Sequence, residues 1–224
     1  MKLFVFLGPP GVGKGTQCSL LAARQGYHHV STGTLVRQEI AAATPLGLRV
    51  KDLVEAGNFV DDESIVQCLE THLKRKAYGV DAVILLDGLP RNLHQVSLLE
   101  ERLPLWGGTF CGAMALVADA EALVERFSKR AICSFCSYVG SWDTTVDLAQ
   151  VTCPSCGKTG GLGRRADDAP AVVRHRANIY KRETEPLLSY YGQKGCLFQV
   201  NGLQAQEVVY EQVSSLLGAV LKDC

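Results

Sequence analysis

Gly8-Pro9-Pro10-Gly11-Val12-Gly13-Lys14-Gly15-Thr16 lies between a wholly apolar run, Leu3–Leu7, and a helical pattern that starts at Lys14 and stops at Gly26. Glycines let a backbone turn tightly and bring its N–H groups close to phosphate oxygens, and the helix N-terminus adds a positive dipole. Lys14 contributes a full positive charge. We therefore predict a phosphate-binding loop that uses Gly11, Val12, Gly13, Lys14, Gly15 and Thr16. The alternative is a tight strand–helix turn with an incidental lysine.

The spacing of this loop fits the pattern GxxxxGK, but Gly15 stands where such loops usually carry Ser or Thr, and the hydroxyl comes one residue later at Thr16. Phosphates and water should therefore hold more of a Mg²⁺ ion than this hydroxyl does. Asp87 ends a second buried run, Val83–Leu86, where a carboxylate often lies near the metal. An isolated Asp could equally cap a helix there, but the phosphate loop favours an Asp87 contact to Mg²⁺ through water.

Short apolar runs alternate with helical patterns along the chain. The runs are Leu3–Leu7, Val83–Leu86, Ala113–Ala118 and Leu197–Val200. The further helical patterns are Asp62–Ala77, Asn92–Arg102, Ala120–Lys129, Asp168–Tyr191 and Gln204–Lys222. This alternation is typical of a parallel sheet with helices on both faces, so we predict an α/β fold. Two inserted segments interrupt it: Ser31–Val60, with helical patches at Gly33–Ala43 and Leu46–Ala56 and no strand between them, and the polar, Gly- and Cys-rich Cys133–Arg164.

The composition is that of an ordinary folded domain. The chain has 224 residues and a mass of 24.2 kDa, with 47% hydrophobic and 21% charged residues. Its 23 basic side chains balance 23 acidic ones, which gives no support to a dedicated binder of nucleic acid or anionic membranes. The apolar runs are far shorter than a membrane span, and no secretory leader pattern opens the sequence. We expect a cytoplasmic protein.

The nine cysteines fall into two groups. Five are scattered and do not resemble a secreted disulfide framework, namely Cys18, Cys68, Cys111, Cys196 and Cys224. The other four form two knuckles, Cys133-x2-Cys136 and Cys153-x2-Cys156. Four thiolates at this spacing can surround one ion tetrahedrally, so we predict a structural Zn²⁺ site, with Fe or Co as other metals for a four-sulfur site. Redox-active CxxC pairs and unliganded core thiols are the alternatives.

Six arginines flank the two inserted segments, namely Arg37, Arg91, Arg126, Arg130, Arg165 and Arg176. Guanidinium groups bind phosphate bidentately and would offset the repulsion between two facing polyphosphates. Arg126 and Arg130 are four residues apart, and we expect them to share one face of a helix. Asp168, before Pro170, is expected to cap the next helix, and Asp167 to orient a neighbouring arginine or an adenosine. A solvated surface charge is the alternative for any single arginine.

Together these motifs resemble the adenylate kinase family. The phosphate loop extended to Gln17, then Ser31-Thr32-Gly33, then Asp87-Gly88-Leu89-Pro90-Arg91 are similar to its signatures. The cysteine knuckles followed by Arg165-Ala166-Asp167-Asp168 resemble the long lid of its bacterial zinc-containing form, and Thr184-x-Pro186-Leu187 with Tyr190-Tyr191 resembles its last long helix. The resemblance covers nearly the whole chain. It implies a P-loop nucleotide kinase core at 1–30, 61–125 and 166–224, an AMP-binding insert at 31–60 and a lid at 126–165.

The resemblance implies reversible, Mg²⁺-dependent phosphoryl transfer between ATP and AMP that gives two ADP. The catalytic residues it implies are Lys14, Arg91, Arg130, Arg165 and Arg176. Arg126 would stack on the ATP base. The implied AMP contacts are Thr32, Arg37, Gly88, Arg91, Gln95, Arg165 and Arg176. The expected partners are ATP, AMP and ADP, with neither nucleic acid nor membrane, and the protein is expected to be a monomer.

The chain departs from the family pattern at three positions. Thr34 stands where the family usually has Asp, Leu89 replaces the usual Phe in what should be a packing change, and Asn92 is reminiscent of pyrimidine nucleotide kinases. UMP or CMP as acceptor and GTP as donor are therefore the alternatives within the same class. From another class, the alternative is a regulatory P-loop ATPase whose cysteine ribbon binds nucleic acid through Lys158, Arg164 and Arg165, although few aromatic residues there could stack on bases.

Overall fold

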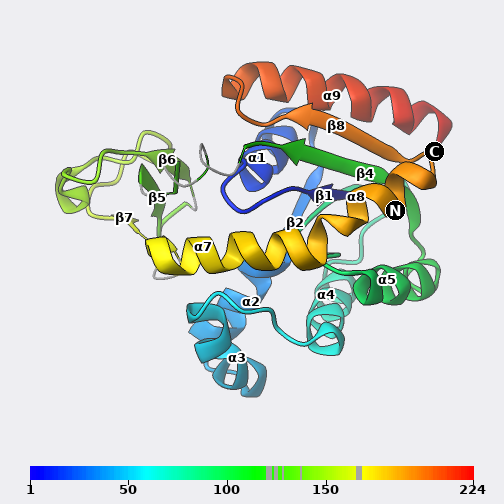
Figure 1. The fold of residues 1–224 in the computed structure, drawn as a ribbon, viewed down its shortest axis with the longest axis horizontal. Coiled ribbons are helices and arrows are strands. Elements are labelled where there is room, and N and C mark those ends of the chain that lie inside the picture. Colours follow the sequence, from blue (N-terminus) through cyan, green and yellow to red (C-terminus); the bar gives the residue numbers. More distant parts are fainter. Residues whose placement is uncertain (120–122, 124–125, 128, 137, 165–167) are drawn as a thin grey trace.

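The computed structural model has the α/β architecture that the sequence predicts. Its described residues are 1–119, 123, 126–127, 129–136, 138–164 and 168–224. Parallel strands form the main sheet in the order β2-β3-β1-β4-β8 (Figure 1). These strands are β1 (Lys2–Leu7), β2 (His28–Ser31), β3 (Val83–Asp87), β4 (Thr109–Val117) and β8 (Leu197–Asn201). Because β1 and β3 are neighbours with Phe6 opposite Asp87, the phosphate loop and Asp87 lie at the same edge of the sheet.

Side chains of the central strands alternate between two hydrophobic layers. Leu3, Val5 and Leu7 of β1 pack into one layer, and Phe4 and Phe6 pack into the other. Burial on both faces explains why β1 is a continuous apolar run. The first layer is completed by α2 (Thr32–Ala41), α3 (Pro45–Glu55), α4 (Asp62–Lys76), α5 (Leu93–Leu105) and α8 (Pro186–Gln193). The second is completed by α1 (Lys14–Gln25) and α9 (Gln206–Asp223).

Strand β2 was not predicted from the sequence. Its four residues, His28–Ser31, include two histidines and a single buried hydrophobic residue, Val30. The segment therefore lacks the apolar run by which the other strands were recognised. Pairing with β3 makes it the edge strand of the sheet, and it leads directly into α2. The two helical patches of the Ser31–Val60 insert are confirmed as α2 and α3.

The predicted helix Asp168–Tyr191 is divided into three segments. They are α7 (Pro170–Ile179), a π-helical turn (Tyr180–Thr184) and α8. Pro186 has no N–H to continue an α-helical ladder, and the wider turn instead bonds Glu185 N to Tyr180 O at 2.9 Å. Of the predicted helix Ala120–Lys129, the structure describes Leu123, Arg126, Phe127 and Lys129 as helical.

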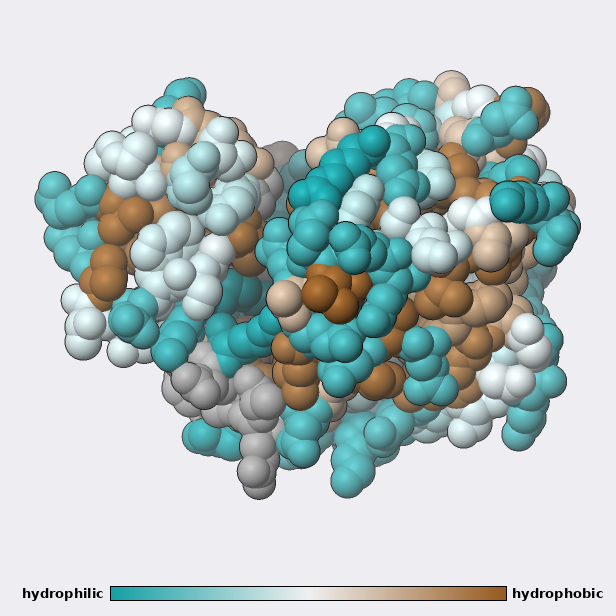
Figure 2. Space-filling view, turned by 90° about the horizontal axis from the view of Figure 1, so that it is seen from above, coloured by the Kyte–Doolittle hydropathy of each residue, from teal (hydrophilic) through white to brown (hydrophobic). Residues whose placement is uncertain are grey.

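The cysteine-rich insert folds as a separate lobe at one end of the molecule (Figure 1). It contains a small antiparallel sheet in the order β6-β5-β7. The strands are β5 (Arg130–Cys133), β6 (Val139–Ser141) and β7 (Leu162–Gly163). We call residues 130–164 the cysteine lobe. The buried hydrophobic residues described in its core are Cys133, Cys153 and Leu162, and Figure 2 shows that much of its surface is hydrophilic or neutral.

A disulfide joins Cys111 on β4 to Cys224 at the end of α9. The sequence analysis described both residues as scattered cysteines and assigned them no partner. Their Cα atoms are 5.7 Å apart although 113 residues separate them, because α9 packs back against the main sheet. Sequence spacing carries no signal for such a pair. Separately, a search of the described residues finds no helix with the length and apolar character needed to cross a membrane.

Candidate active site

The phosphate loop connects β1 to α1 and curls around its own lysine. Lys14 Nζ donates to the carbonyl oxygens of Gly8 at 2.7 Å and Pro9 at 3.0 Å. Gly13, before the first residue of α1, has φ 112°, a conformation that favours glycine. A Cβ at Gly8 would lie 2.3 Å from Leu116 O of β4, so the turn passes too close to the sheet for any side chain. The predicted strand–loop–helix arrangement is therefore present, with one buried ammonium group inside the loop.

Lys14 and Asp87 are the charged centre of the site. Burial lowers the pKa of Lys14 to about 8, although the nearby Asp87 carboxylate opposes this shift. Burial also raises the pKa of Asp87, but the His29 imidazole and the charge of Lys14 outweigh it and leave this pKa below its ordinary value. Asp87 is therefore ionised at neutral pH. His29, whose Nε2 is 3.7 Å from Asp87 Oδ2, was missed by the sequence analysis because β2 was not predicted.

The end of β3 is chemically suited to a Mg²⁺ ion. Hard cations take oxygen ligands, and Asp87 offers an ionised carboxylate beside the phosphate loop. A Cβ at Gly15 would lie 3.4 Å from Asp87 Oδ2, so the backbone of the loop passes directly beside this carboxylate. Asp87 therefore remains the residue that we predict to hold the ion, through water.

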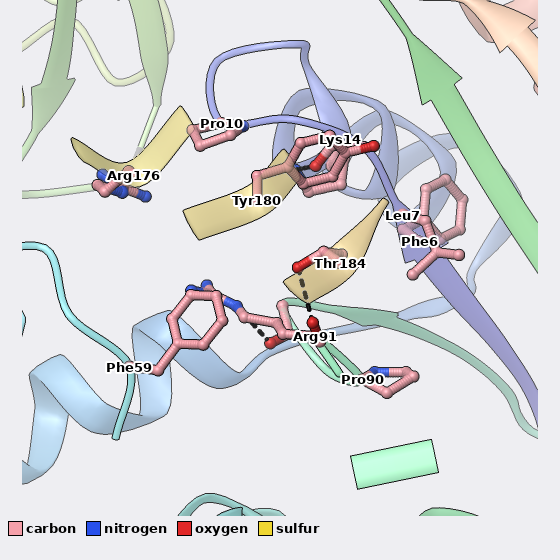
Figure 3. Close-up of a pocket in the computed structure, with 12 residues that line it drawn as sticks. Phe6, Leu7, Pro10, Lys14, Phe59, Pro90, Arg91, Arg176, Tyr180 and Thr184 are labelled. Atoms are coloured by element: carbon pink, nitrogen blue, oxygen red, sulfur yellow. Dashed lines mark hydrogen bonds between the residues drawn. The ribbon is translucent and has the colours of Figure 1, made fainter. Parts of the chain in front are cut away.

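Two cavities open next to the phosphate loop, and both are lined by Phe59, Gly88, Arg91 and Arg176. The first cavity also contacts Lys14 and, from the π-helical turn, Tyr180 and Thr184 (Figure 3). The second cavity contains the other predicted acceptor residues that the structure describes, namely Thr32, Arg37 and Gln95. Its remaining walls are largely apolar, from Val36, Val54, Val60 and Ile65. The shared arginines therefore lie where the two cavities meet.

Arg91 is held by contacts on several sides. Its Nε donates to Gly88 O at 2.8 Å, and its carbonyl oxygen accepts from the Thr184 hydroxyl at 2.7 Å (Figure 3). Its guanidinium lies 4.8 Å from the centre of the Phe59 ring, an attractive cation–π arrangement. Sequence analysis did not single out Phe59, and its only signal was an aromatic residue in a polar turn before Asp61. The loop after α3 therefore helps to position this arginine.

Phe127 contacts two more of the predicted arginines. The Arg130 guanidinium lies 4.5 Å from the centre of this ring and that of Arg176 lies 5.8 Å away. Arg130 also forms an ion pair with Asp168, with a 2.9 Å bond from Nε to Oδ2. Two predictions are thereby wrong: Ala169 rather than Asp168 is the N-cap of α7, and Arg130 begins β5 instead of sharing a helix with Arg126. A buried carboxylate requires a charged partner, which explains the different role of Asp168.

The remaining predicted arginines are dispersed. Arg126 Nη1 donates to Gly202 O at 2.7 Å and lies 3.4 Å from Val12 O, so this side chain rests against the phosphate loop. Arg37 Nη2 lies 3.4 Å from Thr34 Oγ1, where the family pattern would supply a carboxylate. Arg126 and Arg130 line neither cavity. Arg165 and Asp167 lie outside the residues that the structure describes.

The turn after α3 packs against α7 beside the second cavity. Asn58 Oδ1 is hydrogen-bonded to His175 Nε2 at 2.8 Å. Gly57 has φ +79°, and a Cβ there would lie 2.7 Å from Val172 Cγ1 and 2.9 Å from Arg176 Cγ. Only a residue without a side chain lets the insert approach α7 this closely. These contacts place the turn of the insert directly against Arg176 in the wall of one cavity.

The four knuckle cysteines converge in the cysteine lobe, as predicted. Their sulfur atoms all lie within 4.8 Å of one another, with Cys133 and Cys156 3.8 Å apart and Cys136 and Cys153 3.7 Å apart. Sulfurs placed about 2.3 Å from a tetrahedral zinc ion would be about 3.8 Å from each other, so the cluster fits such an ion. Burial raises the pKa of Cys153, but N–H groups of Cys156 and Ser155 bring it down to about 7. The N–H of Lys158 lowers the pKa of Cys156, but burial and the neighbouring sulfurs outweigh it and raise this pKa to about 11. The free cluster therefore favours one thiolate, and metal binding would release protons from the other thiols.

Comparison with known proteins identifies the family. The family model described as adenylate kinase matches residues 6–196. An adenylate kinase of Kosmotoga olearia is 37% identical over 211 residues, covering 93% of this chain and 95% of that protein. Adenylate kinases of Fervidobacterium nodosum and Bacillus subtilis are 37% and 36% identical, each covering 97% of this chain and 98% and 99% of their own lengths. The chain therefore belongs to the adenylate kinase family of nucleoside monophosphate kinases.

Proposed function

We propose that the protein catalyses the reversible, Mg²⁺-dependent reaction ATP + AMP = 2 ADP. The observation that carries the proposal is the pair of adjacent cavities that share Arg91 and Arg176, with Lys14 in one and Gln95 in the other. Two nucleotides whose phosphates face each other would repel, and guanidinium groups at their meeting point offset that repulsion. A hydrolase acting on one nucleotide has no need of the second cavity.

ATP would bind at the phosphate loop. Its phosphates would meet the N–H groups of the loop, the positive end of α1 and the Lys14 ammonium group, which is already buried at this place. A bound polyphosphate would stabilise the charged form of Lys14 and raise its pKa again. Arg126, which lies against Val12, would stack on the adenine of ATP.

AMP would occupy the second cavity. Arg37 and Arg91 would hold its phosphate, and Thr32, Gly88 and Gln95 would meet its base. Asn92 is the residue reminiscent of pyrimidine nucleotide kinases, but its side chain bonds other protein groups and does not line the second cavity. Its Oδ1 accepts from Gln95 N at 2.7 Å, and its Nδ2 donates to Asp62 at 3.1 Å. This engagement favours AMP over UMP or CMP as acceptor.

The transfer step would depend on alignment, charge neutralisation and exclusion of water. Its transition state is loose, so the protein needs neither a covalent intermediate nor a dedicated general base. Arg91, Arg130, Arg165 and Arg176 would surround the transferred group. Mg²⁺, held through water by Asp87, would neutralise charge on the β- and γ-phosphates when bound.

Two segments would close over the substrates to exclude water. They are the AMP-binding insert at 31–60 and the lid at 126–165, which would move against the core at 1–30, 61–125 and 166–224. A structural Zn²⁺ on Cys133, Cys136, Cys153 and Cys156 would hold the lid together, with Fe or Co as other metals for such a site. We propose a cytoplasmic monomer whose partners are nucleotides alone.

A panel of acceptors tests the proposal. ADP formation is followed in a coupled assay with ATP and AMP, UMP, CMP or GMP, on protein whose metal content has been measured, and GTP replaces ATP in a parallel series. We expect AMP to have the highest kcat/KM among the acceptors and ATP to be the preferred donor. A higher kcat/KM for UMP or CMP, or preference for GTP, would reassign the substrate. Salt-dependent oligonucleotide binding with no acceptor-dependent ADP formation would favour a nucleic-acid-binding ATPase.

A further inference from the structure

The Gln95 side chain lies buried at the back of the second cavity, with 2% of its surface exposed. It sits in the first turn of α5, and protein groups contact both ends of its amide. Gln95 Oε1 accepts from the backbone N–H of Arg91 at 2.7 Å. Gln95 Nε2 donates to Asp62 Oδ1, the first residue of α4, at 2.6 Å.

These two contacts determine which way the amide faces. A free amide can rotate by half a turn and exchange its donor and acceptor ends. Here a backbone N–H can only donate and a carboxylate can only accept. Rotation would place N–H against N–H at Arg91 and oxygen against oxygen at Asp62, leaving buried polar groups unpaired, which is costly. The orientation of the Gln95 amide therefore follows from the chemistry of its two neighbours.

Asp62 is itself held firmly in place. Asn92 Nδ2 donates to its two oxygens at 3.1 and 3.2 Å, and His94 Nδ1 lies 2.8 Å from Oδ2. Burial raises the pKa of Asp62, but the hydrogen bonds from His94, Gln95 and Asn92 outweigh it and leave this pKa below its ordinary value. The carboxylate is therefore ionised at neutral pH, and its oxygens act as acceptors. The carboxylate thus presents an acceptor at a set position beneath the cavity.

We propose that Asp62 is a positioning residue that, together with the backbone N–H of Arg91, sets the acceptor-base specificity by holding the Gln95 amide in one orientation. This inference rests on the proposed function, with AMP as acceptor. Each end of the amide keeps one further bond to make, an acceptor site on Oε1 and a donor hydrogen on Nε2. Adenine presents an amino donor beside the ring acceptor N1, whereas a 6-oxopurine presents the reverse order. An amide held by both contacts pairs with adenine. An amide held by the Arg91 N–H alone can rotate more readily, and after rotation it pairs with a 6-oxopurine as well.

Other groups around this cavity carry less information about the base. Its walls at Val36, Val60 and Ile65 are apolar and do not distinguish an amino from an oxo group. The Thr32 hydroxyl donates to Asp87 O at 3.3 Å, and Asn58 Oδ1 is bonded to His175. The Gln95 amide is therefore the group through which the order of donor and acceptor on the base would be recognised.

The test compares AMP with inosine monophosphate, because hypoxanthine has the shape of adenine with a 6-oxo group and a protonated N1. In the wild type we expect kcat/KM to favour AMP strongly. In Asp62→Ala the ratio of the two kcat/KM values should fall by at least about tenfold, the factor that corresponds to 1.4 kcal/mol. The change should consist of a higher KM for AMP and a lower KM for inosine monophosphate. The KM for ATP should be unchanged.

Two further variants separate a change in the orientation of the Gln95 amide from a general disturbance of the structure around Asp62. Asp62→Asn keeps an oxygen that can accept from Gln95 and should retain the wild-type ratio within about threefold, since roughly 0.6 kcal/mol or less is lost. His94→Ala removes a contact to the same carboxylate that does not reach Gln95 and should also retain the ratio. If Asp62→Ala fails to fold by circular dichroism, Asp62→Ser keeps a polar residue in the first turn of α4 but is too short to reach the amide, and it should show the same fall.

A double-mutant cycle provides a second measurement. Gln95→Met removes the amide, so adding Asp62→Ala to it should change the ratio no further. The inference is overturned if folded Asp62→Ala and Asp62→Ser retain the wild-type ratio, or if Asp62→Ala lowers the ratio equally with and without Gln95. A wild-type protein that does not phosphorylate AMP would overturn the proposed function itself, which is a different result.

Discussion

The main sheet and the cysteine lobe are stabilised in different ways. In the sheet, side chains such as Leu3, Phe4 and Leu86 are fully buried between helices on both faces, so hydrophobic burial stabilises the fold. In the cysteine lobe, the described hydrophobic core consists of Cys133, Cys153 and Leu162, with partly buried neighbours. So small a core contributes little on its own, and the converging sulfurs are compatible with a structural metal that would hold the lobe together. The comparison teaches that two parts of one chain can be held together by different physical means.

The largest effect should come from the sheet side of this comparison. Lys14→Ala should lower kcat/KM for transfer by at least about 10³-fold, because it removes a preorganised charge from the phosphates. The protein should remain folded, because Lys14 is only partly buried and lies in the phosphate loop, outside both hydrophobic layers. Lys158→Ala in the cysteine lobe, where Nζ lies 5.0 Å from the ring centre of Phe135, is the matched control and should keep full activity. An equal loss of transfer activity in Lys14→Ala and Lys158→Ala would contradict the assignment of the phosphate contacts to the edge of the main sheet.

Removing one sulfur ligand tests the other side of the comparison. Cys133→Ser should abolish stoichiometric metal, and structural zinc sites contribute roughly 10–16 kcal/mol of apparent binding energy, so the lobe should unfold before the sheet. Hydrogen exchange should accelerate within 130–164 and remain slow in β1 and β4. Activity at low temperature should persist. Cys68→Ser, outside the cluster, serves as the control. Complete loss of activity at an unchanged melting temperature would show that the ion does more than stabilise the lobe.

The Cys111–Cys224 disulfide should stabilise the sheet side alone. Because it closes a long loop, Cys224→Ser should lower the free energy of unfolding by about 2–4 kcal/mol. Denaturant titration of the wild type with a phosphine reductant should reproduce this loss, while the reductant should not affect the variant. Activity and metal content should stay the same. If the reductant lowers the stability of the wild type and of Cys224→Ser equally, the loss does not come from the Cys111–Cys224 disulfide.

Within the site, Arg91→Ala should separate the two cavities. We expect the KM for AMP to rise by roughly 10²-fold, since a charge-assisted bidentate contact to phosphate is lost, and the KM for ATP to change far less. Steady-state kinetics with each substrate varied in turn measures both. A defect confined to ATP would show that Arg91 belongs to the donor phosphates.

The last prediction is a pH dependence of ATP binding just above neutral pH. The pKa of Lys14 is about 8 in the free protein, so this residue is charged below pH 8 and neutral above it. Phosphate binding favours the charged form, and the KM for ATP should therefore rise by no more than about tenfold between pH 8 and pH 9. The KM for AMP, whose predicted phosphate ligands are arginines, should stay level over this range. If the KM values for ATP and AMP rise with pH in the same way, Lys14 is excluded as the cause of the pH dependence.

Local patterns allowed much of the fold to be predicted. The run Leu3–Leu7 and the glycines after it identified β1 and the phosphate loop, and the Cys-x2-Cys spacing identified the sulfur cluster. Leu89, expected as a packing change, is indeed fully buried. In each case the signal lies within a few neighbouring residues, where alternation, glycine content or ligand spacing is visible in the sequence.

Contacts between distant segments could not be predicted in this way. His29 reaches Asp87 only because β2 pairs with β3, Asp168 meets Arg130 across the lobe, and Cys111 meets Cys224 across the sheet. The Asp62–Gln95 bond likewise joins the starts of two helices that the sequence places 33 residues apart. Helix formation, tight turns and the alternation of buried residues depend on near neighbours in the sequence, so a local pattern can predict them. The pairing of polar side chains depends on how the finished layers pack, and only the tertiary structure decided it.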